Sequence, residues 1–146
     1  MPSTLLQPEE KIAIKLAVKS AELNTSGEIR VHIEKRCKGN VLDRAAKVFS
    51  TLNMNKTEQR NGVLFYLAIY DKKFAILGDA GINSVVEIDF WDSIKDKMAA
   101  LFKEGSYTAG LVCGIEMAGY ALKKHFPYDK ETDVNELSDE ISFGNQ

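Results

Sequence analysis

The chain has 146 residues, 45% of them hydrophobic and 27% charged, and its formal net charge is −2 at pH 7. These totals indicate one globular domain that buries a core without disulfides or metal staples, and they exclude the basic excess of a protein that binds nucleic acid or anionic lipid. No segment approaches about 18 consecutive apolar residues, and no secretion-signal pattern begins the sequence. We expect a cytoplasmic monomer that contacts neither a membrane nor nucleic acid.

The chain opens with a predicted helix and a predicted strand. Pro8 stands in a first helical turn, where its missing N–H costs no hydrogen bond, and Asn24 is a residue type that commonly ends helices. Residues 28–33 alternate polar and apolar side chains. Such alternation predicts a strand with one covered face and one wetter face.

A crossover unit and a hairpin follow. Asn40 is expected to cap a helix that runs to about residue 52, and residues 63–70 are an unbroken apolar run typical of a strand covered on both faces. The short polar connection 71–73 joins this run to a second apolar run at 74–77, which predicts an antiparallel hairpin. The strand before the helix and the strand after it should be parallel.

Two further helices complete the domain. Asp89 opens a helix that Gly105 ends, and Ser106 begins a long helix that Pro127 stops. Helices on both faces of a mixed central sheet make an α/β fold, a three-layer α/β/α sandwich. We expect residues 1–128 to form this single domain.

Residues 129–146 are acidic and carry few apolar groups. They form either a disordered tail or a strap that pins Leu137, Ile141 and Phe143 onto the domain. The regular spacing of these three apolar residues favours the strap. The two cysteines should be free thiols, with Cys37 reactive in a charged loop and Cys113 shielded in an apolar helix.

The outer ends of the hairpin are the candidate site. Because the hairpin strands are antiparallel, residues 60–62 and 78–81 should lie side by side at one sheet edge, which the start of the first strand and the helix after the hairpin also reach. Carboxylate and carbonyl oxygens are the ligands that Ca²⁺ and Mg²⁺ prefer. The candidate metal ligands are Glu28, Asp79, Asp89 and Asp92, and the residues that edge the site are Arg60, Asn61, Gly62, Gly78, Gly81 and Asn83.

Three of the four carboxylates also have a structural interpretation. Asp89 and Asp92 are suited to cap a helix and complement its dipole, and Asp79 is suited to a turn in which Arg60 neutralises it. Neither histidine has a metal-binding partner at helical spacing, and phosphate-loop, dinucleotide and serine-nucleophile motifs are absent from the sequence. The chain therefore carries no strong catalytic signature.

Three stretches of the sequence resemble the TPM domain family. They are Thr25-Ser26-Gly27-Glu28-Ile29-Arg30-Val31, then Arg60-Asn61-Gly62-Val63-Leu64 with a glycine turn after the next strand, and Glu104-Gly105-Ser106-Tyr107-Thr108-Ala109-Gly110-Leu111. The resemblance spans roughly residues 8 to 126. It implies an α/β/α sandwich with a mixed sheet, divalent cation binding and, in some plant members, an acid phosphatase activity.

We therefore expect a TPM-like domain that binds Ca²⁺ or Mg²⁺ at the sheet edge. One alternative is a metal-assisted acid phosphatase in which Arg60 holds the phosphate. Asn83 stands where the family often has an acidic residue, and for this reason we expect little phosphatase turnover. The other alternative is a non-enzymatic interaction module that uses the acidic tail.

Overall fold

A computed structural model gives the arrangement of the chain, and it describes residues 6–23, 25–127 and 141–144. The helices are α1 (Pro8–Glu22), α2 (Val41–Thr51), α3 (Ala80–Asn83), α4 (Phe90–Lys103) and α5 (Tyr107–His125), with a 3₁₀ turn, η2, at Met54–Lys56. The strands are β1 (Glu28–Glu34), β2 (Gly62–Ala68), β3 (Lys73–Gly78) and β4 (Ser142–Phe143).

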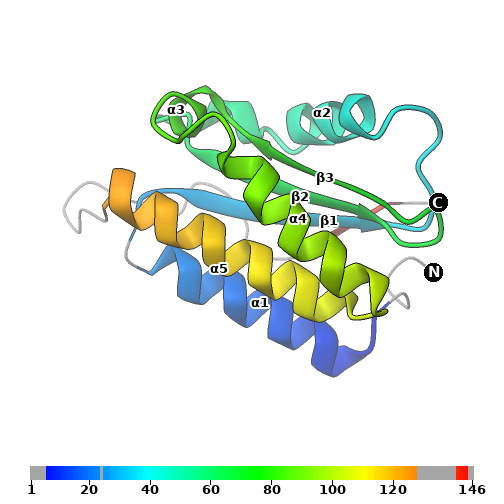
Figure 1. Ribbon diagram of the computed structural model, residues 1–146. Coiled ribbons are helices and arrows are strands. Elements are labelled where there is room, and N and C mark those ends of the chain that lie inside the picture. The colour runs from blue at the N-terminus through cyan, green and yellow to red at the C-terminus, as the bar shows by residue number, and fades with distance from the viewer. Residues whose placement is uncertain (1–5, 24, 128–140, 145–146) are drawn as a thin grey trace.

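The strands form one mixed sheet in the order β3-β2-β1-β4. β1 is parallel to both β2 and β4, whereas β2 and β3 are antiparallel. Helices α1, α4 and α5 lie on one face of this sheet and α2 lies on the other (Figure 1). The predicted crossover, the predicted hairpin and the three-layer α/β/α sandwich are thus confirmed.

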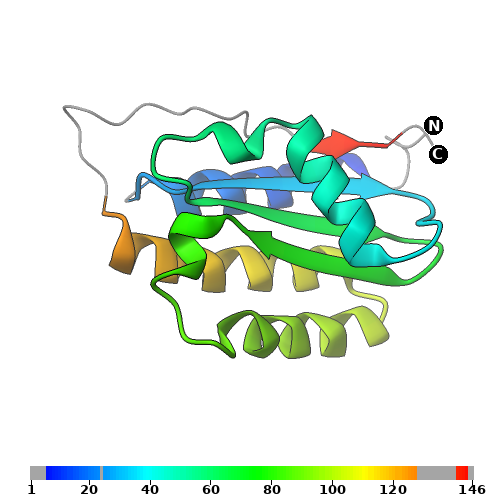
Figure 2. The same cartoon turned by 90° about the horizontal axis from the view of Figure 1, so that it is seen from above.

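Strand β2 divides the core in two. Val63, Phe65 and Leu67 pack among residues of α1, α4 and α5, and Leu64 and Tyr66 belong to the smaller cluster under α2. Every residue of β2 is buried, as expected of an unbroken apolar run. Figure 2 shows α2 crossing the strands on its side of the sheet.

In the part of the chain that the structure describes, no helix has both the length and the apolar character needed to cross a bilayer.

The predicted helix ends are largely confirmed. Pro8 is the first residue of α1. The side chain of Asn40 accepts hydrogen bonds from the backbone N–H groups of Leu42 and Asp43 at 2.8 and 3.1 Å, which makes it the cap of α2. The short helix α3 was not predicted, since four residues are too few to show a helical period.

Two expectations about exposure are wrong. The polar face of β1 is not exposed to solvent: Arg30 is half-buried, and the other six residues of the strand are buried. The cysteines are free, as predicted, but Cys37 is only 2% exposed, whereas Cys113 is partly exposed. Cys37 is buried because its backbone N–H donates to Asp71 at 2.8 Å and its side chain packs in the cluster under α2.

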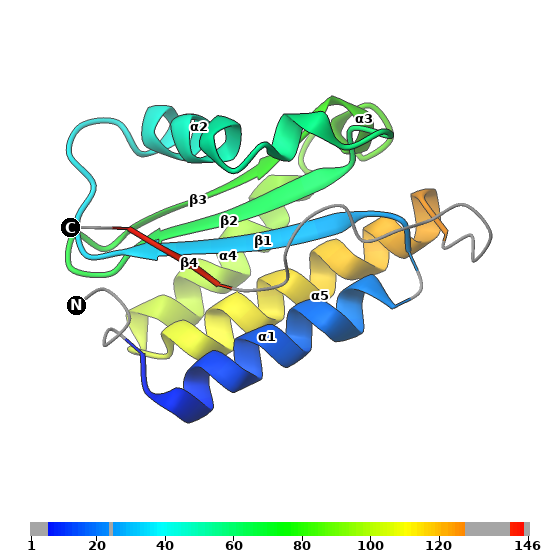
Figure 3. The ribbon, with the colours of Figure 1, turned by 180° about the vertical axis from the view of Figure 1, so that it is seen from behind.

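Residues 141–144 are the part of the predicted C-terminal strap that the structure describes, and they lie against the sheet. In β4, Ser142 pairs with His32 and Phe143 pairs with Ile33, and the N–H of Gly144 donates to the carbonyl of Ile33 at 2.9 Å. Figure 3 shows β4 beside β1 at the edge of the sheet. Ile141 and Phe143 pack against the larger core cluster. The third predicted anchor, Leu137, lies outside the described residues.

Candidate functional site

Three strands bring the predicted site residues to one end of the sheet. Glu28, the first residue of β1, pairs with Gly62, the first residue of β2. Val63 pairs with Gly78 at the end of β3, and the N–H of Asp79 donates to the carbonyl of Gly62 at 2.9 Å. The start of β1 and the end of the hairpin therefore share one edge, as the sequence predicted.

Arg60 and Asp79 form a two-pronged ion pair at this edge. The Nε and Nη2 atoms of Arg60 donate to the two carboxylate oxygens of Asp79 at 2.6 and 2.7 Å. The Arg60 side chain is 50% exposed and that of Asp79 only 6%. Hydrogen bonding and the charge of Asp79 raise the pKa of Arg60. Asp79 also accepts from the N–H of Ala80 at 2.8 Å, so it is both the cap of α3 and the partner of Arg60.

The backbone around Arg60 fixes the position of this pair. Arg60 has a positive φ of 52°, which is uncommon for a residue with a side chain. Its carbonyl accepts hydrogen bonds from the N–H groups of Gly81 at 2.7 Å and Ile82 at 3.3 Å. A Cβ atom on Gly81 would meet the carbonyl oxygens of Gln59 and Arg60. Only glycine therefore allows α3 to approach this turn so closely.

Asn83 connects the end of β3 to the start of α4. Its Nδ2 atom donates to the carbonyl of Gly78 at 2.8 Å, and its Oδ1 atom accepts from Nε1 of Trp91 at 2.8 Å. A Cβ atom on Gly78 would lie 2.5 Å from the Trp91 ring, so the absence of a side chain there lets the ring lie against the strand. The first turn of α4 is therefore held at the candidate site.

Asp89 and Asp92 stand in this part of α4, and both are exposed. Asp89 is the N-cap residue, but among the described residues its side chain makes no capping hydrogen bond. Asp92 lies in the first turn, where a carboxylate complements the helix dipole. The interpretation of Asp89 as a side-chain cap is therefore wrong.

Glu28 does not lie beside Asp79. It is 2% exposed and lies two strands away from Asp79, a spacing of about 10 Å between Cα atoms. Met54 lies over Gly62, the residue between them. The neighbouring Asn61 is 1% exposed and its Nδ2 donates to Oγ of Ser26 at 3.3 Å.

The four carboxylates thus share one end of the sheet without surrounding a common point. Across the described ranges, no three histidine, cysteine, aspartate or glutamate side chains gather as a metal-binding group. Both oxygens of Asp79 are directed at Arg60. The donor set has the right chemistry for a hard cation, but ligation would need Arg60 to leave Asp79.

A buried polar cluster that sequence reasoning missed lies at the other end of β1. Glu34 is fully buried and accepts hydrogen bonds from Nε and Nη2 of Arg44, both at 2.8 Å. It also accepts from the hydroxyl of Tyr66, and Nε2 of His32 lies 3.2 Å from its Oε1. The His32 ring stacks on Tyr66 with the ring centroids 5.8 Å apart. The only sequence signal was the polar row of β1, which did not show the partners from α2 and β2.

This surrounding sets the charges in the cluster. Burial raises the pKa of Glu34, but the hydrogen bonds from Arg44, Tyr66 and His32 lower it more, to about 2. Burial lowers the pKa of His32, and its contact with Glu34 offsets part of that effect. Burial and the neighbouring Glu34 raise the pKa of Tyr66. At neutral pH the cluster is therefore a Glu34–Arg44 ion pair with neutral His32 and Tyr66.

Comparison with known proteins decides the family. The family model described as the TPM domain matches residues 2–121. The chain belongs to the TPM domain family. The matched residues include the whole candidate site, whereas β4 and its contact with the buried cluster lie beyond them.

This TPM domain is similar to two solved structures. The NMR structure of the BA42 protein from the psychrophilic bacterium Bizionia argentinensis is 52% identical, with a TM-score of 0.88 and 95% of each chain covered. The NMR structure of the N-terminal domain of the cg2496 protein from Corynebacterium glutamicum is 11% identical, with a TM-score of 0.66 over 82% of this chain and 75% of that one. The second likeness concerns the fold alone. The search of curated proteins found no match.

Proposed function

We propose that this TPM domain binds a divalent cation, Ca²⁺ or Mg²⁺, at the end of the sheet where Glu28, Asp79, Asp89 and Asp92 lie. One observation supports the proposal above the others. The side chain of Asn83 bonds to Trp91 in the first turn of α4 and to Gly78 at the end of β3. Gly78 directly precedes Asp79, so this turn of α4 is held near Asp79. Asp89 and Asp92 then offer exposed carboxylates, the ligands that hard cations prefer.

Arg60 is the competitor of the cation in this proposal. A guanidinium and a divalent cation repel each other and compete for the Asp79 carboxylate. Half of the Arg60 side chain is exposed, so it can turn into water when a cation takes its place. Glu28 is only 2% exposed and lies on β1, two strands away from the end of β3, so it is not among the first ligands. The cation therefore binds first to Asp79, Asp89 and Asp92.

A calorimetric titration with CaCl₂ and with MgCl₂ tests whether the cation competes with Arg60 for Asp79. Asp79→Asn removes a ligand and should weaken binding. Arg60→Gln removes the competitor and should strengthen it, because Asp79 is then free to bind the ion. The matched control is Asp96→Asn, an exposed carboxylate elsewhere on α4, which should leave the affinity unchanged. The proposal fails if Arg60→Gln does not strengthen binding, or if Asp79→Asn and Asp96→Asn behave alike.

The same variants distinguish cation binding from phosphatase chemistry. If Arg60 held a phosphate, Arg60→Gln would lower a Mg²⁺-dependent rate of phosphate-ester hydrolysis. We expect no such rate in the unaltered chain, because both prongs of Arg60 are directed at Asp79. A metal-dependent rate that disappears in Arg60→Gln would replace our proposal with the enzymatic one.

A further inference from the structure

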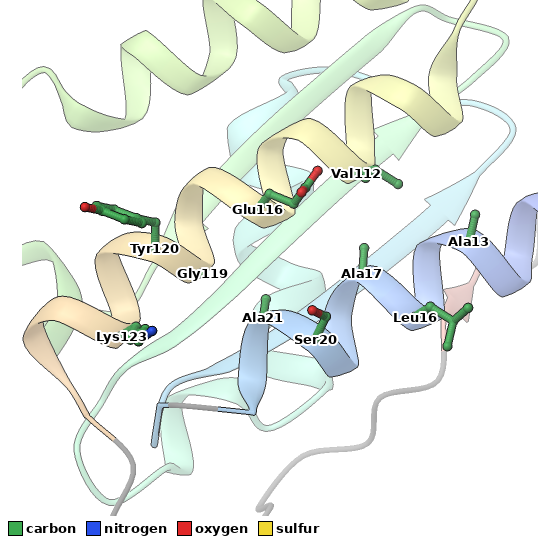
Figure 4. Close-up of a pocket in the computed structure, with 10 residues that line it drawn as sticks. All are labelled: Ala13, Leu16, Ala17, Ser20, Ala21, Val112, Glu116, Gly119, Tyr120 and Lys123. Carbon is green, nitrogen blue, oxygen red and sulfur yellow. The ribbon is translucent and has the colours of Figure 1, made fainter.

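A groove of about 500 Å³ runs between α1 and α5 on the outer side of the helical layer. Small residues make its floor: Ala13, Ala17 and Ala21 point from α1 toward α5 (Figure 4). A Cβ atom on Gly119 would lie 2.6 Å from Cβ of Ala21, so the absence of a side chain at Gly119 lets the two helices approach each other there. The groove is lined by Ala13, Leu16, Ala17, Ser20, Ala21, Val112, Glu116, Gly119, Tyr120 and Lys123.

Two large, mainly apolar side chains that line the groove are exposed to solvent. Leu16 on α1 is 60% exposed and Tyr120 on α5 is 78% exposed. Tyrosine is enriched at protein interfaces, because it buries a large apolar ring while its hydroxyl stays hydrogen-bonded. A shallow floor of small residues beside an exposed aromatic ring is a shape into which a second such ring can fit.

The charges on α5 are arranged so that two antiparallel copies of the helix would place opposite charges side by side. Glu116 and Lys123 lie on either side of Tyr120, seven residues apart, a rise of about 10 Å along the helix. Both are exposed, and within the described ranges neither has an ion-pair partner. A two-fold axis that passes near Tyr120 and is perpendicular to α5 makes the second α5 run in the opposite direction. Glu116 of each copy then lies opposite Lys123 of the other copy.

We propose that the groove binds a second copy of this chain in a two-fold dimer. Tyr120 of each copy enters the groove of the other beside Leu16, and Glu116 of each copy pairs with Lys123 of the other. The positions of Glu116 and Lys123 favour a second copy over an unrelated partner. The same surface of each copy carries both the acidic and the basic member of the two ion pairs. This dimer replaces the monomer that we expected from the sequence.

Sedimentation velocity over a wide range of protein concentration tests the dimer. The unaltered chain should show a concentration-dependent dimer. Glu116→Lys alone and Lys123→Glu alone each place like charges opposite each other, and each should weaken the dimer by about tenfold or more. The double variant Glu116→Lys with Lys123→Glu restores both pairs and should restore the dimer. Both positions are exposed, so circular dichroism should show that every variant keeps its fold.

A second pair of variants tests the apolar part of the interface. Tyr120→Ser should abolish the dimer, whereas Ile88→Ser, at a fully exposed residue outside the groove, should not change it. A chain that sediments as a monomer at every concentration would overturn the proposal and leave the groove to another partner. A dimer that the double charge swap does not restore would also overturn it, since its interface would then lie elsewhere.

Discussion

The Oγ atom of Ser142 lies 2.9 Å from the Nδ1 atom of His32, which connects the last described strand to a buried histidine. The other ring nitrogen of His32 contacts Glu34, and Arg44 and Tyr66 hold that glutamate in turn. The edge strand β4 thus contacts the buried polar cluster of β1 in addition to its backbone pairing with that strand. Its attachment should depend on the protonation of that cluster.

We expect the free energy of unfolding to fall in two steps as the pH decreases. The ordinary pKa of His32 is 6.5, and burial lowers it in the folded chain. Below pH 6.5 the unfolded chain therefore binds a proton more readily than the folded chain, and stability falls. The Glu34 pKa is lowered from 4.5 to about 2. Its contribution, about 3 kcal/mol, is complete above pH 4.5 and is lost as the pH falls toward 2.

Urea unfolding at a series of pH values measures both steps. His32→Gln should remove the upper step and keep the lower one, because glutamine does not titrate. If the upper step survives in His32→Gln, another group causes it and the assignment is wrong.

Glu34→Gln tests the buried ion pair directly. The substitution keeps the shape of the side chain but leaves the guanidinium of Arg44 without its anion, so we expect a loss of about 3–5 kcal/mol in the free energy of unfolding. The matched control, Asp43→Asn on the exposed side of α2, should change it by less than about 0.5 kcal/mol. Equal effects of the two substitutions would show that the pair adds nothing beyond a surface charge.

Gly81→Ala tests the turn that positions Arg60. The added Cβ atom would meet two backbone carbonyl oxygens, so the turn must shift, and we expect a loss of at least about 2 kcal/mol. The control is Gly105→Ala, at a positive φ of 81° with open space around the added atom, where only backbone strain of about 1 kcal/mol applies. A Gly81→Ala variant as stable as Gly105→Ala would contradict this account of the turn.

The cysteines should react in the order opposite to the one that the sequence suggested. Cys113 is partly exposed on α5, and Cys37 is 2% exposed under α2. A thiol reagent added to the folded protein should therefore modify Cys113 first, and Cys37 only as the chain unfolds. The Cys113→Ser variant isolates Cys37, and rapid labelling of that variant would contradict the structure.

Features that depend on one segment alone could be predicted from the sequence. The apolar run of β2, the cap at Asn40 and the proline of α1 each carry a local signal, and these signals predicted the layers and the hairpin correctly. Antiparallel pairing then placed Gly62 beside Asp79. That step was enough to predict the edge of the sheet at which the candidate site lies.

Features that join distant segments could not be predicted in this way. The pairing of Ser142 with His32 and the contact of Glu34 with Arg44 depend on how β4 and α2 pack against β1. The Asn83–Trp91 bond depends likewise on the packing of α4. None of these contacts leaves a period or a motif in the sequence, because each partner looks like an ordinary polar or aromatic residue of its own segment.

The central claim is that a divalent cation replaces Arg60 at Asp79 and is held by Asp89 and Asp92. An NMR titration with CaCl₂ and with MgCl₂, followed residue by residue, tests it most directly. We predict that amide shifts change chiefly within residues 78–92 and that the Nε–H signal of Arg60 shifts as its ion pair opens. No change in residues 78–92 at millimolar cation, or a response confined to residues 129–140, would contradict the claim.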